Sequence, residues 1–268
     1  SFDESLAGGV AELALQDGIH VANASIGGHA ALNQFEFARW LHEDKRLAVS
    51  NYVLLVTPLM VQYSDSYTRT SVGKDGRLYE DPSDRLAYVR LWIKTHFVLY
   101  NRLRDAIRNA GIGSRPKDDM PSVFRLFGTG DSEEVSHRKF GSYLKQVKAF
   151  ADKQGAGMRI VYVPLTVEAD FDSVRNTAER KGVKLDQNLP ARVCATAAAE
   201  LGIPLQDLRP VLKQLHEQGD PLRLKGDFHY DRILSKACAA SIWSKLRNEP
   251  GKTAYHHNEM NIKSAYGN

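Results

Sequence analysis

The chain has 268 residues, of which 43% are hydrophobic and 25% charged, and its formal net charge is +4. This composition is typical of a globular domain long enough to bury a large core without disulfide or metal staples. The positive charge is too weak to argue for a nucleic-acid-binding protein, and no nucleic-acid partner is expected. No apolar run approaches the roughly 20 residues needed to cross a membrane, so no membrane span is expected.

Short apolar runs alternate with stretches of helical periodicity along the chain. The runs predicted as buried strands are residues 19–24, 52–57, 158–163 and, on a weaker pattern, 205–208. The predicted helices are residues 4–17, 29–42, 84–110, 133–154, 170–182, 190–201 and 231–247. Strands that alternate with helices predict an α/β fold, a three-layer α/β/α sandwich of flavodoxin-like type with a central parallel sheet.

The domain organisation follows from two irregular stretches and a polar tail. Residues 62–83 and 111–132 are rich in Gly, Pro, Ser and Asp, and they are interpreted as insertions over one edge of the sheet. One domain is therefore expected over residues 1–247, with helical insertions at about residues 62–132. Residues 248–268 form a polar C-terminal tail, because Pro250-Gly251 ends the last predicted helix.

The two cysteines, Cys194 and Cys238, lie in alanine-rich helical stretches and not at a metal-binding spacing. They are interpreted as small apolar core residues. A single disulfide between them remains the alternative for an extracytoplasmic chain. The adjacent histidines 256 and 257 have no acidic or cysteine partner at ligand spacing, so neither a metal site nor a cofactor is expected.

Asp227 and His229 lie two residues apart in a polar turn directly before the last predicted helix. On an extended turn their side chains can point the same way. The carboxylate then fixes the tautomer of the imidazole and leaves its other nitrogen as a base. Ligands of open parallel sheets bind beyond the carboxyl ends of the strands, which is where this turn is expected. The pair is therefore predicted to be the orienting acid and the general base of an acyl-transfer site.

A second candidate element follows the first predicted strand, in the sequence Asn23-Ala-Ser-Ile-Gly-Gly28-His29. The glycine pair lets backbone N–H groups approach a ligand closely, which suits an oxyanion hole. A tight strand-to-helix turn is the alternative interpretation. His29 adjoins this element and is a candidate substrate contact.

Taken in this order, the segments resemble the SGNH/GDSL hydrolase family, in particular its larger bacterial esterases and O-acetyltransferases. The family's Gly-Asp-Ser block is represented from its serine onward, as Ser1-Phe-Asp-Glu-Ser5, the second block by Asn23 to Gly28, and the last by Asp227-Phe-His229. The resemblance implies that Ser1 is the nucleophile and that the Ser1 and Gly28 amides stabilise the oxyanion. It also implies a carbohydrate O-acetyl ester or another small ester as substrate, and it slightly favours an extracytoplasmic location.

The sequence departs from the family pattern at two places, the oxyanion donor and the central strand. Leu59 stands where the family has an oxyanion-donating Asn, and Gln62 and Asn33 are the candidates to replace that donor. The family's central strand precedes its serine, so more residues are expected before Ser1, on this chain or on a companion fragment. Both departures favour the alternative of a catalytically degenerate binding or assembly module.

Two further alternatives remain. Gly130-Asp131-Ser132 is a literal Gly-Asp-Ser, but it follows the glycine-rich segment where the family has its nucleophile first. Ser132 is therefore predicted to cap the helix that begins at Glu133, with a role as nucleophile as the second choice. A nucleotide-binding flavodoxin-like domain is ranked last, because no glycine-rich phosphate loop is evident.

Overall fold

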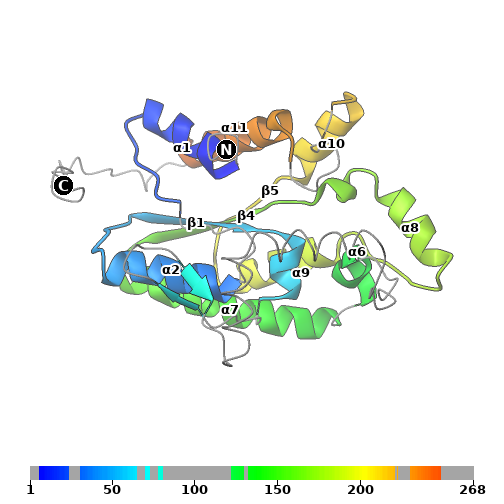
Figure 1. Cartoon of the computed structure of the whole chain (residues 1–268), viewed down its shortest axis with the longest axis horizontal. Coiled ribbons are helices and arrows are strands. Elements are labelled where there is room, and N and C mark those ends of the chain that lie inside the picture. The colour runs from blue at the N-terminus through cyan, green and yellow to red at the C-terminus, as the bar shows by residue number, and fades with distance from the viewer. Residues whose placement is uncertain are drawn as a thin grey trace, which may run out of the picture.

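A computed structural model describes residues 6–23, 31–64, 70–72, 78–80, 122–129, 132–220, 222 and 230–248. Within them the fold is mixed α/β, with a small three-stranded parallel sheet flanked by helices (Figure 1). The sheet consists of β1 (Asn51–Val56), β4 (Gly157–Tyr162) and β5 (Leu205–Asp207), in the order β1-β4-β5. A separate antiparallel pair is formed by β2 (Thr70–Val72) and β3 (Leu78–Glu80).

The three parallel strands end level with one another. Val56 pairs with Tyr162, and Tyr162 pairs with Asp207, so the last residue of each strand lies on one line across the sheet. This register places the segments that follow the strands side by side at a single edge, which is called the carboxyl edge below.

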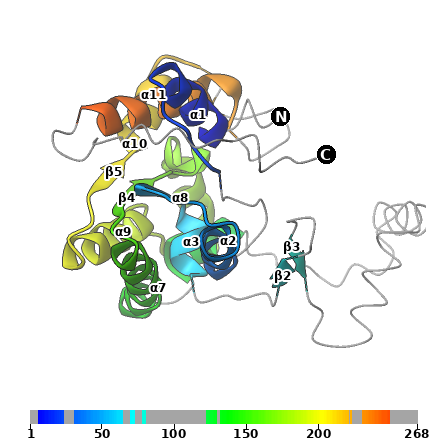
Figure 2. The ribbon, with the colours of Figure 1, turned by 90° about the vertical axis from the view of Figure 1, so that its left-hand side faces the viewer.

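Helices cover both faces of the sheet, and β4 alternates between the two cores as a strand must. Ile160 and Tyr162 belong to the core that also contains side chains from α2 (Ala31–Glu43), α3 (Pro58–Gln62), α7 (Glu133–Lys153) and α9 (Leu189–Glu200). Val161 and Val163 belong to the core shared with α1 (Leu6–Gln16), α10 (Arg209–Glu217) and α11 (Arg232–Arg247). Figures 1 and 2 show the two groups of helices on opposite sides of the strands.

A third apolar cluster lies beside these two cores. It joins α6 (Ser122–Phe124) and the π-helical turn η2 (Arg125–Thr129) to α8 (Phe171–Glu179). The rings of Phe127 and Phe171 meet at its centre, with centroids 5.0 Å apart. The short turn η3 (Thr166–Glu168) connects this cluster to the end of β4.

Local sequence signals explain why α7 begins where it does. The Ser132 hydroxyl accepts a hydrogen bond from the Val135 N–H at 3.4 Å, and Glu133 and Glu134 occupy the first turn, where carboxylates complement the helix dipole. The prediction that Ser132 caps this helix is confirmed. Asp131, its neighbour in the Gly-Asp-Ser sequence, lies outside the described residues.

Most of the predicted elements in the described residues are confirmed, with ends that differ by at most three residues. This holds for the strands at 52–57, 158–163 and 205–208, and for the helices at 4–17, 29–42, 133–154, 170–182, 190–201 and 231–247. The predicted helix at 84–110 lies outside the described residues. The helices α3, α6 and α10 were not predicted, and neither was the strand pair β2–β3; α6 and the strand pair lie inside the stretches interpreted as irregular.

The predicted strand at 19–24 is wrong over its described part, residues 19–23, which contains no strand. Gly18 adopts a positive φ of 74° after α1. The Ile19 N–H then donates to the Ala14 carbonyl at 2.9 Å, and the Gly18 N–H donates to the Leu15 carbonyl at 3.0 Å. These two bonds are a Schellman helix cap, so Ile19 closes α1 where the apolar run suggested the start of a strand.

The cysteines behave as core residues. Cys194 packs in the core with α7 and α9, Cys238 packs in the core with α1 and α10, and both thiols are free and buried. The interpretation as apolar core residues is confirmed, and the disulfide alternative is wrong because the two residues lie on opposite faces of the sheet. Burial raises the pKa of each thiol to about 12.

No helix in the described part of the chain is both long enough and apolar enough to span a bilayer.

Candidate functional site

The carboxyl edge of the sheet is the place where the strand ends bring polar groups together. β1 leads into Thr57, β4 leads into residues 163–168, and β5 leads into Arg209. In parallel α/β sheets this edge is where ligands bind, because side chains and free backbone groups from several loops converge there. We therefore take it as the candidate site and describe its residues from β4 outward.

Glu168 is the most unusual of these residues, because its carboxyl group is buried with only 6% of the residue exposed. One oxygen accepts the Leu165 N–H at 2.7 Å, and the other accepts the Tyr162 hydroxyl at 3.4 Å. The Gln187 side chain donates to the Glu168 backbone carbonyl at 2.7 Å. Burial raises the pKa of Glu168 to about 7, against the opposing effect of the Leu165 hydrogen bond.

Arg209 supplies a positive charge beside this carboxyl group. Its Nε and Nη2 donate to Asp207 Oδ2 at 2.8 and 2.6 Å, and its Nη1 donates to Asn188 Oδ1 at 2.8 Å. The guanidinium carbon also lies 5.7 Å from the centre of the Tyr162 ring. Hydrogen bonding to Asp207 raises the pKa of Arg209, so the group is cationic at any physiological pH.

Tyr230 connects the segment before α11 to this same edge through a hydrogen bond. Its hydroxyl donates to the Pro164 carbonyl, two residues beyond the end of β4. The next residue, Asp231, is 8% exposed; its carboxylate accepts the Leu234 N–H at 2.8 Å and so caps α11. Burial raises the pKa of the Tyr230 hydroxyl. The side chains of these two consecutive residues thus hold the start of α11 against the turn after β4.

The arrangement of the predicted catalytic residues stays a prediction. The predicted nucleophile, oxyanion donor, substrate contact, acid and base all lie outside the described residues; they are Ser1, Gly28, His29, Asp227 and His229. Asn23 is the last residue described before Ala31, and its side chain is half-buried. The structure does describe Tyr230, the residue directly after His229. Its hydroxyl is bound to the Pro164 carbonyl at the carboxyl edge.

Leu59, which the resemblance implies stands in place of an oxyanion donor, lies on α3, the helix that follows β1, and is 48% exposed. Neither candidate replacement is similarly accessible. Gln62 is 7% exposed, and its oxygen accepts the Ser136 hydroxyl at 3.4 Å where α3 packs on α7. Asn33 on α2 is fully buried.

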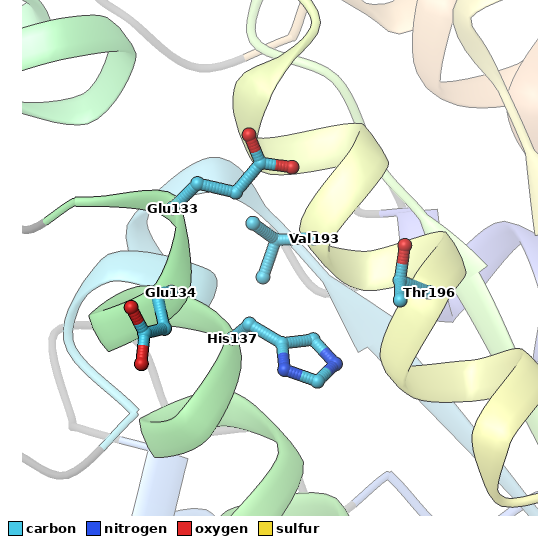
Figure 3. Close-up of a pocket in the computed structure, with 5 residues that line it drawn as sticks. All are labelled: Glu133, Glu134, His137, Val193 and Thr196. Atoms are coloured by element: carbon cyan, nitrogen blue, oxygen red, sulfur yellow. The ribbon is translucent and has the colours of Figure 1, made fainter.

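A shallow hollow of about 340 Å³ lies between α7 and α9. Figure 3 shows the side chains that line it, which are Glu133, Glu134, His137, Val193 and Thr196. Arg192 neutralises Glu133 through two hydrogen bonds of 2.8 Å, and His137 Nε2 lies 3.2 Å from Glu200. Within the described ranges, no group of three or more His, Cys, Asp or Glu side chains is placed to hold a metal ion.

Sequence reasoning missed the cluster around Glu168. The signal for Arg209 was present, because Asp207 and Arg209 stand two residues apart at the end of a predicted strand. For Glu168 there was no comparable signal. A single carboxylate in a loop is normally exposed, and its burial here depends on residues from β4 and from the segment before α9.

Comparison of the chain with protein-family models, with curated proteins and with solved structures finds no match. The resemblance to SGNH/GDSL hydrolases therefore rests on the short motifs in the sequence.

Proposed function

We propose that this chain performs serine-dependent acyl-ester chemistry, as an SGNH/GDSL-type ester hydrolase or O-acyltransferase. The proposed substrate is an acetylated carbohydrate or another small ester. The proposal includes the finer fold of that family, a three-layer α/β/α sandwich. The parallel sheet with helices on both faces is consistent with it.

One observation supports the proposal most. The residue that directly follows the Asp227-Phe-His229 motif, Tyr230, is bound to the Pro164 carbonyl at the carboxyl edge. Tyr230 therefore lies at the edge where parallel α/β proteins bind their ligands, and the proposal puts the motif that precedes it at the same edge.

The chemistry assigns a separate task to each predicted residue. His229 removes the proton of the Ser1 hydroxyl, Asp227 orients and charge-balances the imidazole, and the serine oxygen attacks the ester carbonyl. The backbone N–H groups of Ser1 and Gly28 stabilise the oxyanion, while Asn23 and His29 contact the substrate. The covalent seryl ester is then resolved by water in a hydrolase or by a sugar hydroxyl in a transferase.

Leu59 favours a second candidate function, a degenerate member that binds a glycan or another protein without turning over an ester. Its exposed aliphatic side chain has no hydrogen-bond donor to offer. Loss of one oxyanion donor costs about 10²–10³ in rate, so a chain with an aliphatic residue there is a weak catalyst unless another group donates.

Ester hydrolysis by variants of the predicted pair tests the proposal. With 4-nitrophenyl acetate as substrate, H229A and D227N are expected to lower kcat/KM by about 10²–10⁴, because H229A removes the general base and D227N removes the carboxylate that orients it. The matched controls are H216A on α10 and D172N on α8, both exposed residues with no role in the predicted site, and they should keep full activity. A folded wild-type protein that releases no 4-nitrophenol, or variants that match it, would favour the binding module.

A further inference from the structure

Glu168 stands at a junction of four segments of the carboxyl edge. Its side chain contacts Tyr162 at the end of β4 and the N–H of Leu165 in the turn that follows. Its backbone carbonyl accepts the side chain of Gln187, from the segment before α9. Pro164, in the same turn, accepts the Tyr230 hydroxyl from the segment before α11. All of these contacts therefore involve residues of the turn at 163–168.

The charged and titratable groups that act on Glu168, among the residues described, come from each of the elements packed against it. They are Tyr162 on β4, Asp207 at the end of β5, Arg209 on α10, and Tyr230 before α11. Arg209 attracts the ionised carboxylate and Asp207 repels it. The guanidinium is already engaged by Asp207 and Asn188, so its charge is shared and only partly offsets the burial of Glu168.

We propose that Glu168 is a proton-controlled latch: the neutral carboxyl group holds the turn at 163–168 closed, and ionisation loosens it. In the neutral form the carbonyl oxygen still accepts the Leu165 N–H, and the carboxyl proton faces the Tyr162 hydroxyl, which can accept it. In the ionised form a negative charge is buried, and Arg209, the cation that attracts it, is shared with Asp207. Local opening of the turn hydrates that charge and relieves the cost.

The direction of the pH effect follows from the same burial. The pKa of Glu168 is about 7 in the folded protein, against 4.5 for the group in its ordinary state. A raised folded-state pKa means that the stabilisation is complete at acidic pH and is lost as the pH rises from about 4.5 through about 7. The latch is therefore closed in mildly acidic solution and loosened above neutrality. This regulation does not depend on the proposed acyl chemistry.

Amide hydrogen exchange of the full chain at pH 5 and pH 7.5, corrected for the intrinsic pH dependence of exchange, tests the latch. Protection of residues 163–168 is expected to fall roughly ten- to hundredfold at the higher pH in the wild-type protein. E168Q keeps the shape and the acceptor oxygen but cannot ionise, so its protection should be independent of pH. E179Q changes an exposed residue of α8 and should behave as wild type.

Three results would overturn the latch. They are wild-type protection that does not change with pH, an E168Q protein that keeps the pH dependence, and an equally large loss in α7, which would assign the effect to global unfolding. If E168Q does not fold, the side-chain ¹³C resonance of Glu168 in the wild-type protein decides. A titration midpoint near 7 supports the latch, and a midpoint near 4.5 contradicts it.

Discussion

Two tyrosines show how differently a buried hydroxyl can be placed. The Tyr230 hydroxyl donates to the Pro164 carbonyl and joins the start of α11 to the turn after β4. The Tyr52 hydroxyl, on β1, is buried and has no hydrogen-bond partner in the part of the chain that the structure describes. Removing a hydroxyl that donates a hydrogen bond leaves its acceptor unpaired. Removing a buried hydroxyl that has no partner instead removes the cost of burying that polar group.

Tyr230→Phe is therefore expected to lower the free energy of unfolding by about 1 kcal/mol. Tyr52→Phe is the matched control and should be neutral or slightly stabilising. Urea denaturation of the two variants and the wild type measures the difference. Equal destabilisation by both variants, or none by Tyr230→Phe, would show that the bond to Pro164 contributes nothing to the fold.

Individual residues were predictable from the sequence where their role is local. The capping role of Ser132 depends only on the residues that follow it, because the N-cap hydroxyl bonds an N–H three positions on. Glu168 was not predictable, since its burial and its contact with Tyr162 depend on how β4 and the next turn pack. The Asp227 and His229 pair was selected from its residue types, its spacing, its position before the last helix and the family resemblance, and it lies outside the described residues.

At the scale of elements, periodicity predicted the longer helices and the three strands of the sheet. It failed at residues 19–23, because Ile19 looks like the start of a strand but closes α1 through a Schellman cap after Gly18. It also missed α3, with 5 residues, because one and a half turns are too few for a helical pattern to appear. Short elements are fixed by their neighbours in the fold more than by their own sequence.

The packing of α1 on α11 depends on close approach at Gly9. A Cβ added there would lie 2.9 Å from the Cβ of Ala239. Gly141, inside α7, has open space around the same position. Gly9→Ala is therefore expected to destabilise the protein by about 1–3 kcal/mol through overpacking. Gly141→Ala should stabilise it by about 0.5–1 kcal/mol through helix propensity.

Thermal unfolding of the two glycine variants measures both effects. A shift of the melting temperature in opposite directions is the expected result. An unchanged melting temperature in Gly9→Ala would contradict close packing of α1 on α11. It would show that the core containing Val10 and Ala239 can accommodate an extra methyl group.

At the scale of the whole molecule, alternation of strands and helices correctly predicted a parallel sheet with helices on both faces. The order β1-β4-β5 and the level ends of the strands were not predictable, because they arise from pairing between segments about 50 to 100 residues apart. The convergence of Glu168, Arg209 and Tyr230 at one edge follows from that register. It was therefore beyond the reach of any local pattern.

The acyl-ester account is tested most directly by labelling the folded protein with a fluorophosphonate probe, followed by digestion and mapping of the modified peptide. The account predicts a single phosphonylated serine, Ser1, whose labelling is lost in H229A and retained in S132A, because Ser132 caps α7. Absence of labelling in a folded protein, or an adduct on Ser132, would contradict it.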